Sequence, residues 1–327
     1  MKVLAGLILT GLISASAAAL TAPVPEQRDQ LAEANAALQA GEADKALALL
    51  NTLAQPGGEA EAYNLRCRVE YTLEHWDLAA KDCEQAVKLE GQNSDDHLWL
   101  GRALGEKARR ASFLSAFSLA KRTRAEFEEA ARLNPNNVEA LAALGEFYYS
   151  APAIIGGGID KSETVAAQLD KIDPVRAREL RSNIAEHRKD YGTAEQELKQ
   201  AIAGSPHPAF QWMALASFYQ RRERFVDMES AIHSGEHAVK RDKHAGVALY
   251  NGASILRATK RDPERAAKML EEYLGGSAKT EEGPAFAAHT WLSQLKQQLG
   301  DTAAAIWERA TALALAHEYK PAQDLKY

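Results

Sequence analysis

Residues 63–93 read YNLRCRVEYTLEHWDLAAKDCEQAVKLEGQN, and the fold of this chain is predicted from the pattern in this stretch. Tyr63 is followed four positions later by a small residue, Cys67, and a turn ahead of Trp76 leads to further small residues from Ala79 onward. Small residues suit the positions where two antiparallel helices touch, while large residues fill the gaps between neighbouring pairs. The stretch therefore predicts a helix, a turn and a second helix within about 34 residues.

The same register recurs along the chain. Seven further segments carry it: 31–56, 97–135, 141–174, 178–206, 212–240, 250–273 and 288–315. Eight copies in a near-constant register indicate a helical repeat array. In this the chain resembles the tetratricopeptide-repeat (TPR) family over almost all of its expected mature length. The resemblance implies an all-α solenoid, a right-handed superhelix with at least six antiparallel helix pairs and no sheet.

Two copies depart from the regular length. The segment 97–135 is longer by about ten residues, which predicts that both of its helices are extended. The second departure is a glycine-rich insertion at about 150–159, SAPAIIGGGI. Insertions of this kind gather on one face of a repeat protein and are often functional. Over residues 95–170 the chain also resembles, more weakly, periplasmic TPR proteins associated with solute transporters.

Composition excludes several classes of protein. The 327 residues are 46% hydrophobic and 26% charged, which excludes wholesale disorder. The formal net charge of −6 argues against a general nucleic-acid-binding protein, which needs a basic surface. No segment after the N-terminal one is long and apolar enough to span a membrane.

The first segment has the pattern of a secretory signal peptide. Lys2 precedes an apolar run over residues 3–13, and the small residues 14–19 allow cleavage after Ala19. We therefore expect residues 1–19 to be removed and residues 20–327 to form a single solenoid in the bacterial periplasm or outside the cell. An uncleaved N-terminal anchor is the alternative.

The two cysteines, Cys67 and Cys83, flank the turn at His75 almost symmetrically. Antiparallel helices place such positions opposite one another, and an exported protein is free to form disulfides. We expect a Cys67–Cys83 disulfide; the alternative is two buried free thiols. Because there is no C-x-x-C motif, redox catalysis is not expected.

The resemblance also implies a binding groove. In TPR arrays, first-helix positions next to the small residue face the concave side, and the register carries this role onto ten residues. They are Arg68, Tyr71, Arg102, Glu146, Tyr149, Asn183, Ser217, Arg221, Ser254 and Arg257. We expect the arginines to form a ladder that faces an acidic or carboxylate-bearing ligand. Ordinary solvated surface is the alternative.

Three further motifs admit both a functional and a structural interpretation. His233, Glu236 and His237 match H-x-x-E-H, in which two histidines on one helix face hold zinc, and His244 would join them if the helix continued. Gly156–Gly158 precede a helix start that could bind an anion. We favour surface histidines and a structural loop, because Gly235 weakens the helix and no phosphate-binding motif is present.

Basic clusters at Arg109–Phe113 and Lys121–Arg124 read either as solvated helix faces or as a docking patch for an acidic partner. No nucleophile–base set is recognisable, so we expect no enzyme and no cofactor. The leading hypothesis is a periplasmic scaffold that binds a protein or peptide in its groove. The alternatives are a ligand-binding accessory subunit of a solute transporter and a metal-dependent hydrolase.

Overall fold

Eight successive helix pairs make up the chain in a computed structural model, which describes residues 25–242 and 244–327. The helices are α1 (Pro25–Ala40), α2 (Ala43–Leu53), α3 (Ala60–Thr72), α4 (Trp76–Leu89), α5 (Ser94–Arg110), α6 (Phe113–Leu133), α7 (Val138–Ser150), α8 (Ile159–Leu169), α9 (Pro174–His187), α10 (Tyr191–Gly204), α11 (Ala209–Arg221), α12 (Phe225–Val239), α13 (Val247–Thr259), α14 (Pro263–Gly275), α15 (Ala285–Gln298), α16 (Thr302–Leu315) and α17 (Lys320–Gln323), with a short 3-10 helix, η1 (Ala153–Ile155). No strand occurs among these residues. The all-α solenoid is thus confirmed, while the predicted signal peptide lies outside the described residues.

Local sequence explains where the helices begin and how they pair. Asn137, Asp173 and Asp190 stand immediately before α7, α9 and α10, and each side chain accepts a hydrogen bond from a backbone N–H of the first turn. Within the pairs, small residues such as Ala79 and Ala86 are fully buried. Their size lets the two helix backbones approach closely, which is the steric basis of the repeat.

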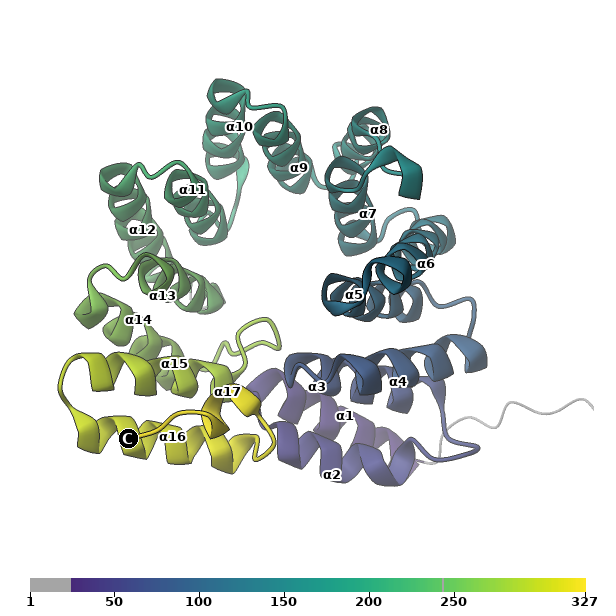
Figure 1. Ribbon diagram of the computed structural model, residues 1–327, viewed down its shortest axis with the longest axis horizontal. Coiled ribbons are helices and arrows are strands. Elements are labelled where there is room, and N and C mark those ends of the chain that lie inside the picture. The colour runs from purple at the N-terminus through teal and green to yellow at the C-terminus, as the bar shows by residue number, and fades with distance from the viewer. Residues whose placement is uncertain (1–24, 243) are drawn as a thin grey trace, which may run out of the picture.

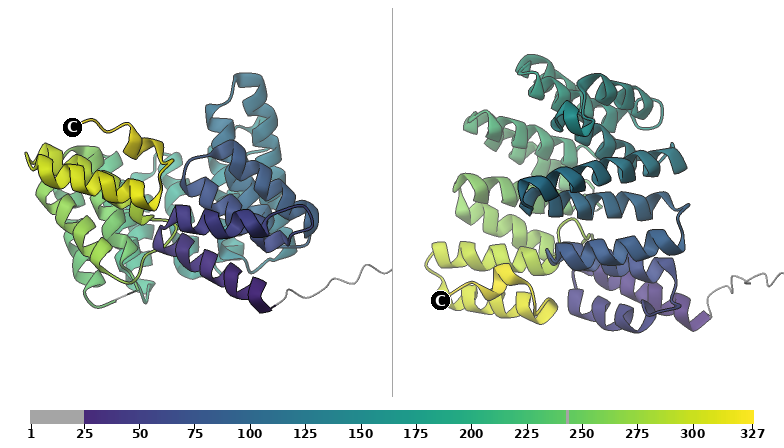
Figure 2. Two further views of the ribbon diagram at one scale, coloured as in Figure 1. Left: turned by 90° about the horizontal axis from the view of Figure 1, so that it is seen from below. Right: turned by 45° about the vertical axis from the view of Figure 1, so that its right-hand side comes forward.

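The solenoid closes on itself into a ring. In Figure 1 the first helix of each pair lies on the inside of this ring and the second on the outside, and α16 comes to lie beside α2. Both views in Figure 2 show the yellow C-terminal helices next to the purple N-terminal ones. One buried cluster unites the two ends, with Leu50 and Val69 on one side and Phe286 and Tyr319 on the other.

Polar contacts reinforce this closure. The guanidinium of Arg68 is paired with the carboxylate of Glu281, which also accepts a hydrogen bond from the Gln39 amide. We call Gln39, Arg68 and Glu281 the clasp. On the outer side, the backbone N–H of His317 donates to Asp44, and the two side chains are paired at 2.8 Å.

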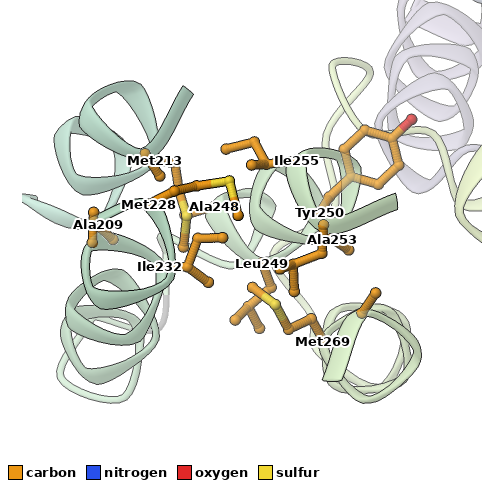
Figure 3. Packing of buried hydrophobic residues seen from close by; sticks show 14 of the residues in the cluster. Ala209, Met213, Met228, Ile232, Ala248, Leu249, Tyr250, Ala253, Ile255 and Met269 are labelled. Carbon is orange, nitrogen blue, oxygen red and sulfur yellow. The ribbon is translucent and has the colours of Figure 1, made fainter. Parts of the chain in front are cut away.

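The largest apolar cluster runs from α9 to α15 and keeps the second half of the ring rigid. Met213, Met228, Ile232 and Met269 pack together there with exposures of 2% or less (Figure 3). Burying one such side chain stabilises the fold by about 1.5–3 kcal/mol. The inner helices α9, α11 and α13 are therefore a firm support for whatever side chains they present to the interior of the ring.

Two helices are conspicuous for length. α5 has 17 residues and α6 has 21, whereas α3, α7 and α11 have 13 each. None of the helices within residues 25–242 and 244–327 is at once long and apolar enough to cross a membrane.

Candidate binding site on the inner face of the ring

A pocket with a volume of about 720 Å³ lies on the inner face of the ring. We call it the inner pocket. Its walls come from the first helices of four consecutive pairs, α7, α9, α11 and α13, with Leu198 behind them and Glu282 from the α14–α15 loop. Apolar lining residues include Phe210 and Ile255, so the pocket combines an apolar floor with polar walls.

Half of the residues assigned to the groove from the repeat register line this pocket. They are Glu146, Asn183, Ser217, Arg221 and Ser254. The side chains of Asn183 and Ser254 have no hydrogen-bond partner within the described residues and are available to a ligand. The register therefore places these first-helix positions together on one concave surface.

The other five groove residues are engaged elsewhere. Tyr71 packs edge-on between Trp76 and Trp99, at centroid distances of 5.1 and 5.5 Å. The ring of Tyr149 lies against that of His187, and burial raises its pKa to about 12. The side chains of Tyr71 and Tyr149 thus pack against neighbouring aromatic rings, and neither of them lines the inner pocket.

The remaining three are arginines, and each already has a partner. Arg68 belongs to the clasp. Arg102 lies over the Trp99 ring and donates to Glu139 at 3.1 Å. Arg257 lies over Trp291, and burial lowers its pKa. A ladder of free guanidinium groups, expected from spacing alone, does not form.

Arg221 completes this correction, although it does line the pocket. Its guanidinium makes two hydrogen bonds to Glu186, at 2.9 and 2.7 Å. The register predicted which positions face inward, but it carried no information on the carboxylates that face them from neighbouring repeats. Arg68, Arg102 and Arg221 are thus each paired with a carboxylate, whereas Arg257 contacts the Trp291 ring and the Gln294 amide.

The register also missed several lining residues. Glu139 and Arg176 stand seven positions before Glu146 and Asn183, hence two helical turns earlier on the same face. This seven-residue spacing is visible in the sequence and could have predicted that Glu139 and Arg176 face the groove. Glu282 lies in a loop, and nothing in the repeat pattern pointed to it.

Two carboxylates in the inner pocket lack a cation. Arg176 is shared between Glu139 and Glu179, whereas the side chains of Glu146 and Glu282 form no ion pair or hydrogen bond within the described residues. Glu282 is exposed to solvent, yet the protein around it displaces enough water to raise its pKa, and the nearby Glu139 raises it further. The pocket therefore carries an uncompensated negative charge.

A buried amide adds an unpaired acceptor. Gln211 is only 7% exposed, and its Nε2 donates to Glu179 at 2.9 Å. Its Oε1 is buried in the pocket wall and has no hydrogen-bond partner in the described part of the chain. Because a buried polar atom without a partner is costly, this oxygen favours a ligand that brings a donor.

The cysteine and histidine motifs have clear positions. Cys67 and Cys83 face each other across α3 and α4 with their Cα atoms 5.4 Å apart, which is disulfide geometry.

His233 and His237 are exposed on α12, with their Nε2 atoms 3.1 Å apart. α12 ends at Val239, so His244 does not continue their face. In the described residues no three His, Cys, Asp or Glu side chains gather to hold a metal ion.

The glycine-rich loop has structural partners. Gly156 has a φ of +93°, and its backbone lies so close to the Arg124 side chain that a Cβ would overlap it. Arg124 donates to the carbonyl of Ile155, and Lys161 to that of Gly156. The loop is thus tied to α6 and α8 by side-chain donors.

The comparisons with known proteins agree on the fold. No family model and no curated protein matches the sequence. Among solved structures, a TPR protein from Thermus thermophilus is 18% identical, with a TM-score of 0.50 over 59% of this chain and 98% of that one. A tetratricopeptide repeat protein from Parabacteroides merdae is 13% identical, with a TM-score of 0.45 over 84% of this chain and all of that one. The match to the Thermus thermophilus structure and the succession of helix pairs show that this chain has a TPR-type helical solenoid fold.

Proposed function

We propose that this protein is a non-enzymatic scaffold whose inner pocket binds an extended, basic segment of a partner protein. The observation that carries the proposal is the pairing of two free carboxylates, Glu146 and Glu282, with the unpaired Oε1 of Gln211 in one concave site. Lysine and arginine side chains, and backbone N–H groups, supply the charge and the donors that these three acceptors lack.

The shape of the site supports a segment of chain. Packed helices lie about 8–10 Å apart; α7 packs on α9 and α11 on α13, while α9 and α11 lie farther apart, so the four helices give a surface at least roughly 25 Å long. That matches an extended segment of about eight residues. By contrast, a transporter accessory subunit would need an enclosed pocket built from the 100–160 region, and only Glu139, Ala142 and Glu146 of that region line the inner pocket.

The N-terminal sequence extends this proposal to the cellular compartment in which the protein acts. A cleaved signal peptide at residues 1–19 would make the protein an exported scaffold, in the periplasm of a bacterium. N-terminal sequencing of the protein recovered from the periplasm tests this step: a start at residue 20 supports it, and an intact N-terminus contradicts it.

A peptide titration tests the pocket. The probe is a fluorescent octapeptide of alternating lysine and serine, compared with one in which glutamate replaces lysine. We expect the basic peptide to bind, and the double variant Glu146→Gln, Glu282→Gln to weaken it about tenfold or more, about 1.4 kcal/mol. Thermal stability should hardly change, because neither carboxylate is paired in the folded protein.

The matched control is Glu61→Gln with Glu264→Gln, two exposed carboxylates that lie away from the pocket on α3 and α14. This variant should bind the basic peptide as the unaltered protein does. Preference for the acidic peptide, or equal loss in both double variants, would contradict the assignment of the site.

A further inference from the structure

The longest helix pair ends in an exposed apolar turn. Phe113 and Leu114 begin α6 with exposures of 85% and 81%, and Ser112 and Ser115 on either side are exposed as well. Water contact at two adjacent large apolar side chains is unfavourable, and the packing of the ring does not require it. Covering these two side chains with an apolar partner would therefore be favourable.

The turn projects beyond the neighbouring helices. On one side, α4 begins at Trp76, and the ring of this residue lies beside Arg110, the last residue of α5. On the other side, the α7–α8 loop contacts α6 at Arg124, which donates to the Ile155 carbonyl and lies 11 residues after the start of α6. The first turns of α6 between these levels extend past both neighbours, and Figure 2 (left) shows the blue α5–α6 pair rising above the rest of the ring. The apolar residues are thus at a convex end.

A strongly basic collar surrounds this end. Residues 107–124, which we call the α5–α6 tip, contain six lysines and arginines and no acidic residue, in a chain whose net charge is −6. The six are Lys107, Arg109, Arg110, Lys121, Arg122 and Arg124. Lys121 has no carboxylate partner among the residues that the structure describes, and it lies over the Phe117 ring.

The other cations of the collar have carboxylate partners: Lys107 pairs with Asp77 and Arg124 with Glu128, and Arg124 also donates to the Ile155 carbonyl. Arg109 and Arg110 share Glu106 of their own helix, and Arg122 contacts Glu84 while both side chains are nearly half exposed. A pair in which both side chains are exposed, such as Arg122–Glu84, contributes little to stability, and the Arg109 side chain is 69% exposed although it contacts Glu106. The collar is therefore available to an anionic surface.

From these observations we propose that the α5–α6 tip docks on an anionic lipid surface, with Phe113 and Leu114 inserted among the lipids and the basic collar on the headgroups. A convex apolar point suits a soft surface that deforms around it, whereas a protein partner would need a matching cavity. Leu114 and Lys121 are seven residues apart on one helix, about 10 Å along its axis. That is the depth to which interfacial apolar groups enter a bilayer.

Other exposed apolar residues lack this combination. Val226 is 81% exposed, but the charges near it in the sequence balance: Arg221, Arg222 and Arg224 stand against Glu223, Asp227 and Glu229. It serves as a matched control, because its exposure is similar and the charged residues around it have no excess of positive charge.

Sedimentation with lipid vesicles tests the proposal. The full chain is mixed with phosphatidylcholine vesicles that contain about 30% phosphatidylglycerol, and with vesicles of phosphatidylcholine alone. We expect the anionic vesicles to bind more protein, and salt raised from about 0.05 M to about 0.5 M to reduce that difference. Every variant carries the same N-terminal segment, so its own affinity for lipid cancels in the comparisons.

Variants separate the tip from the rest of the surface. Phe113→Ser with Leu114→Ser should weaken binding to anionic vesicles about tenfold or more, whereas Val226→Ser should leave it unchanged. Arg109→Gln with Lys121→Gln should also weaken it, whereas Lys240→Gln with Lys268→Gln, two exposed lysines on the opposite part of the ring, should not. Equal binding by the tip variants and their controls would overturn the proposal.

A local probe gives an independent readout. A tryptophan introduced as Phe113→Trp should shift its emission to the blue on anionic vesicles and be quenched by brominated lipid, whereas Val226→Trp should show neither effect. Absence of both changes at position 113 would overturn insertion. A dimer in solution that dissociates in the Phe113→Ser, Leu114→Ser variant, without vesicle binding, would assign the tip to a second copy of the chain instead.

Discussion

The guanidinium of Arg68 on α3 is paired with the carboxylate of Glu281, which lies 213 positions later in the chain. Its Nε and Nη2 atoms donate at 3.0 and 2.5 Å, so the contact is bidentate. The pair is largely buried, with side-chain exposures of 20% and 13%. It joins the second repeat to the loop before the last one, and it places Glu282, the next residue, at the inner pocket.

We expect Glu281→Gln to open or loosen the ring. Removing the charge of one member of a largely buried pair leaves Arg68 without compensation, which should lower the free energy of unfolding by about 1–3 kcal/mol. Urea denaturation measures this, and small-angle X-ray scattering should show a larger radius. The control is Glu129→Gln, which breaks the bidentate but exposed pair with Arg132 and should change stability very little.

Gly41 lies where the ring closes, and its replacement should be costly. Its φ is +74°, and a Cβ there would overlap the backbone of Ala285 on α15. Gly57 has a φ of +91°, but no atom lies within 4 Å of its Cβ position. Both Gly→Ala variants carry backbone strain of about 1 kcal/mol. Gly41→Ala should cost roughly 1–3 kcal/mol more, measured by urea denaturation. Equal losses would show that the contact with Ala285 is unimportant.

Asp96 should make stability depend on pH. It is 2% exposed, and its Oδ1 accepts a hydrogen bond from the Asn64 amide. Its Oδ2 has no hydrogen-bond partner within the described residues, and burial raises its pKa to about 6. The unfolded value is about 3.9, so folding favours the protonated acid. Its stabilising contribution is present below about pH 4 and is lost as the pH rises through about 6.

Asp96→Asn should therefore stabilise the protein at pH 8, by at most about 3 kcal/mol, because the variant no longer buries a charge. The gain should shrink at about pH 4. Urea denaturation at the two pH values checks this, with Asp29→Asn, an exposed acid on α1, as the control. A gain that is the same at both values would mean that ionisation of Asp96 does not limit stability.

The Cys67–Cys83 disulfide remains a prediction for exported protein. Its Cα separation of 5.4 Å requires no backbone movement. A cross-link over 16 positions should stabilise the fold by about 3 kcal/mol. Non-reducing peptide mapping should recover the linked pair, and reduction should lower the melting temperature. Two thiols that alkylate freely in the native protein would reject the prediction.

The sequence alone determined the repeat. A small residue such as Ala79 or Cys83 can pack only where two helices touch, and this requirement operates within about 34 residues, so it is visible in the linear pattern. The same local register placed Glu146, Asn183 and Ser254 on the inner surface, because positions next to the small residue share one helix face.

Only the tertiary structure decided the partners of these residues and the closure of the ring. The small rotation between successive pairs accumulates over eight of them, and no local pattern encodes whether the last pair meets the first. The accumulated rotation brings Glu281 into contact with Arg68, and Ala285 into contact with Gly41. Carboxylates from other repeats likewise pair with Arg68, Arg102 and Arg221, because an ion pair depends on distance in space and not on spacing in the chain. For the same reason, the negative charge of the inner pocket follows from the folded ring.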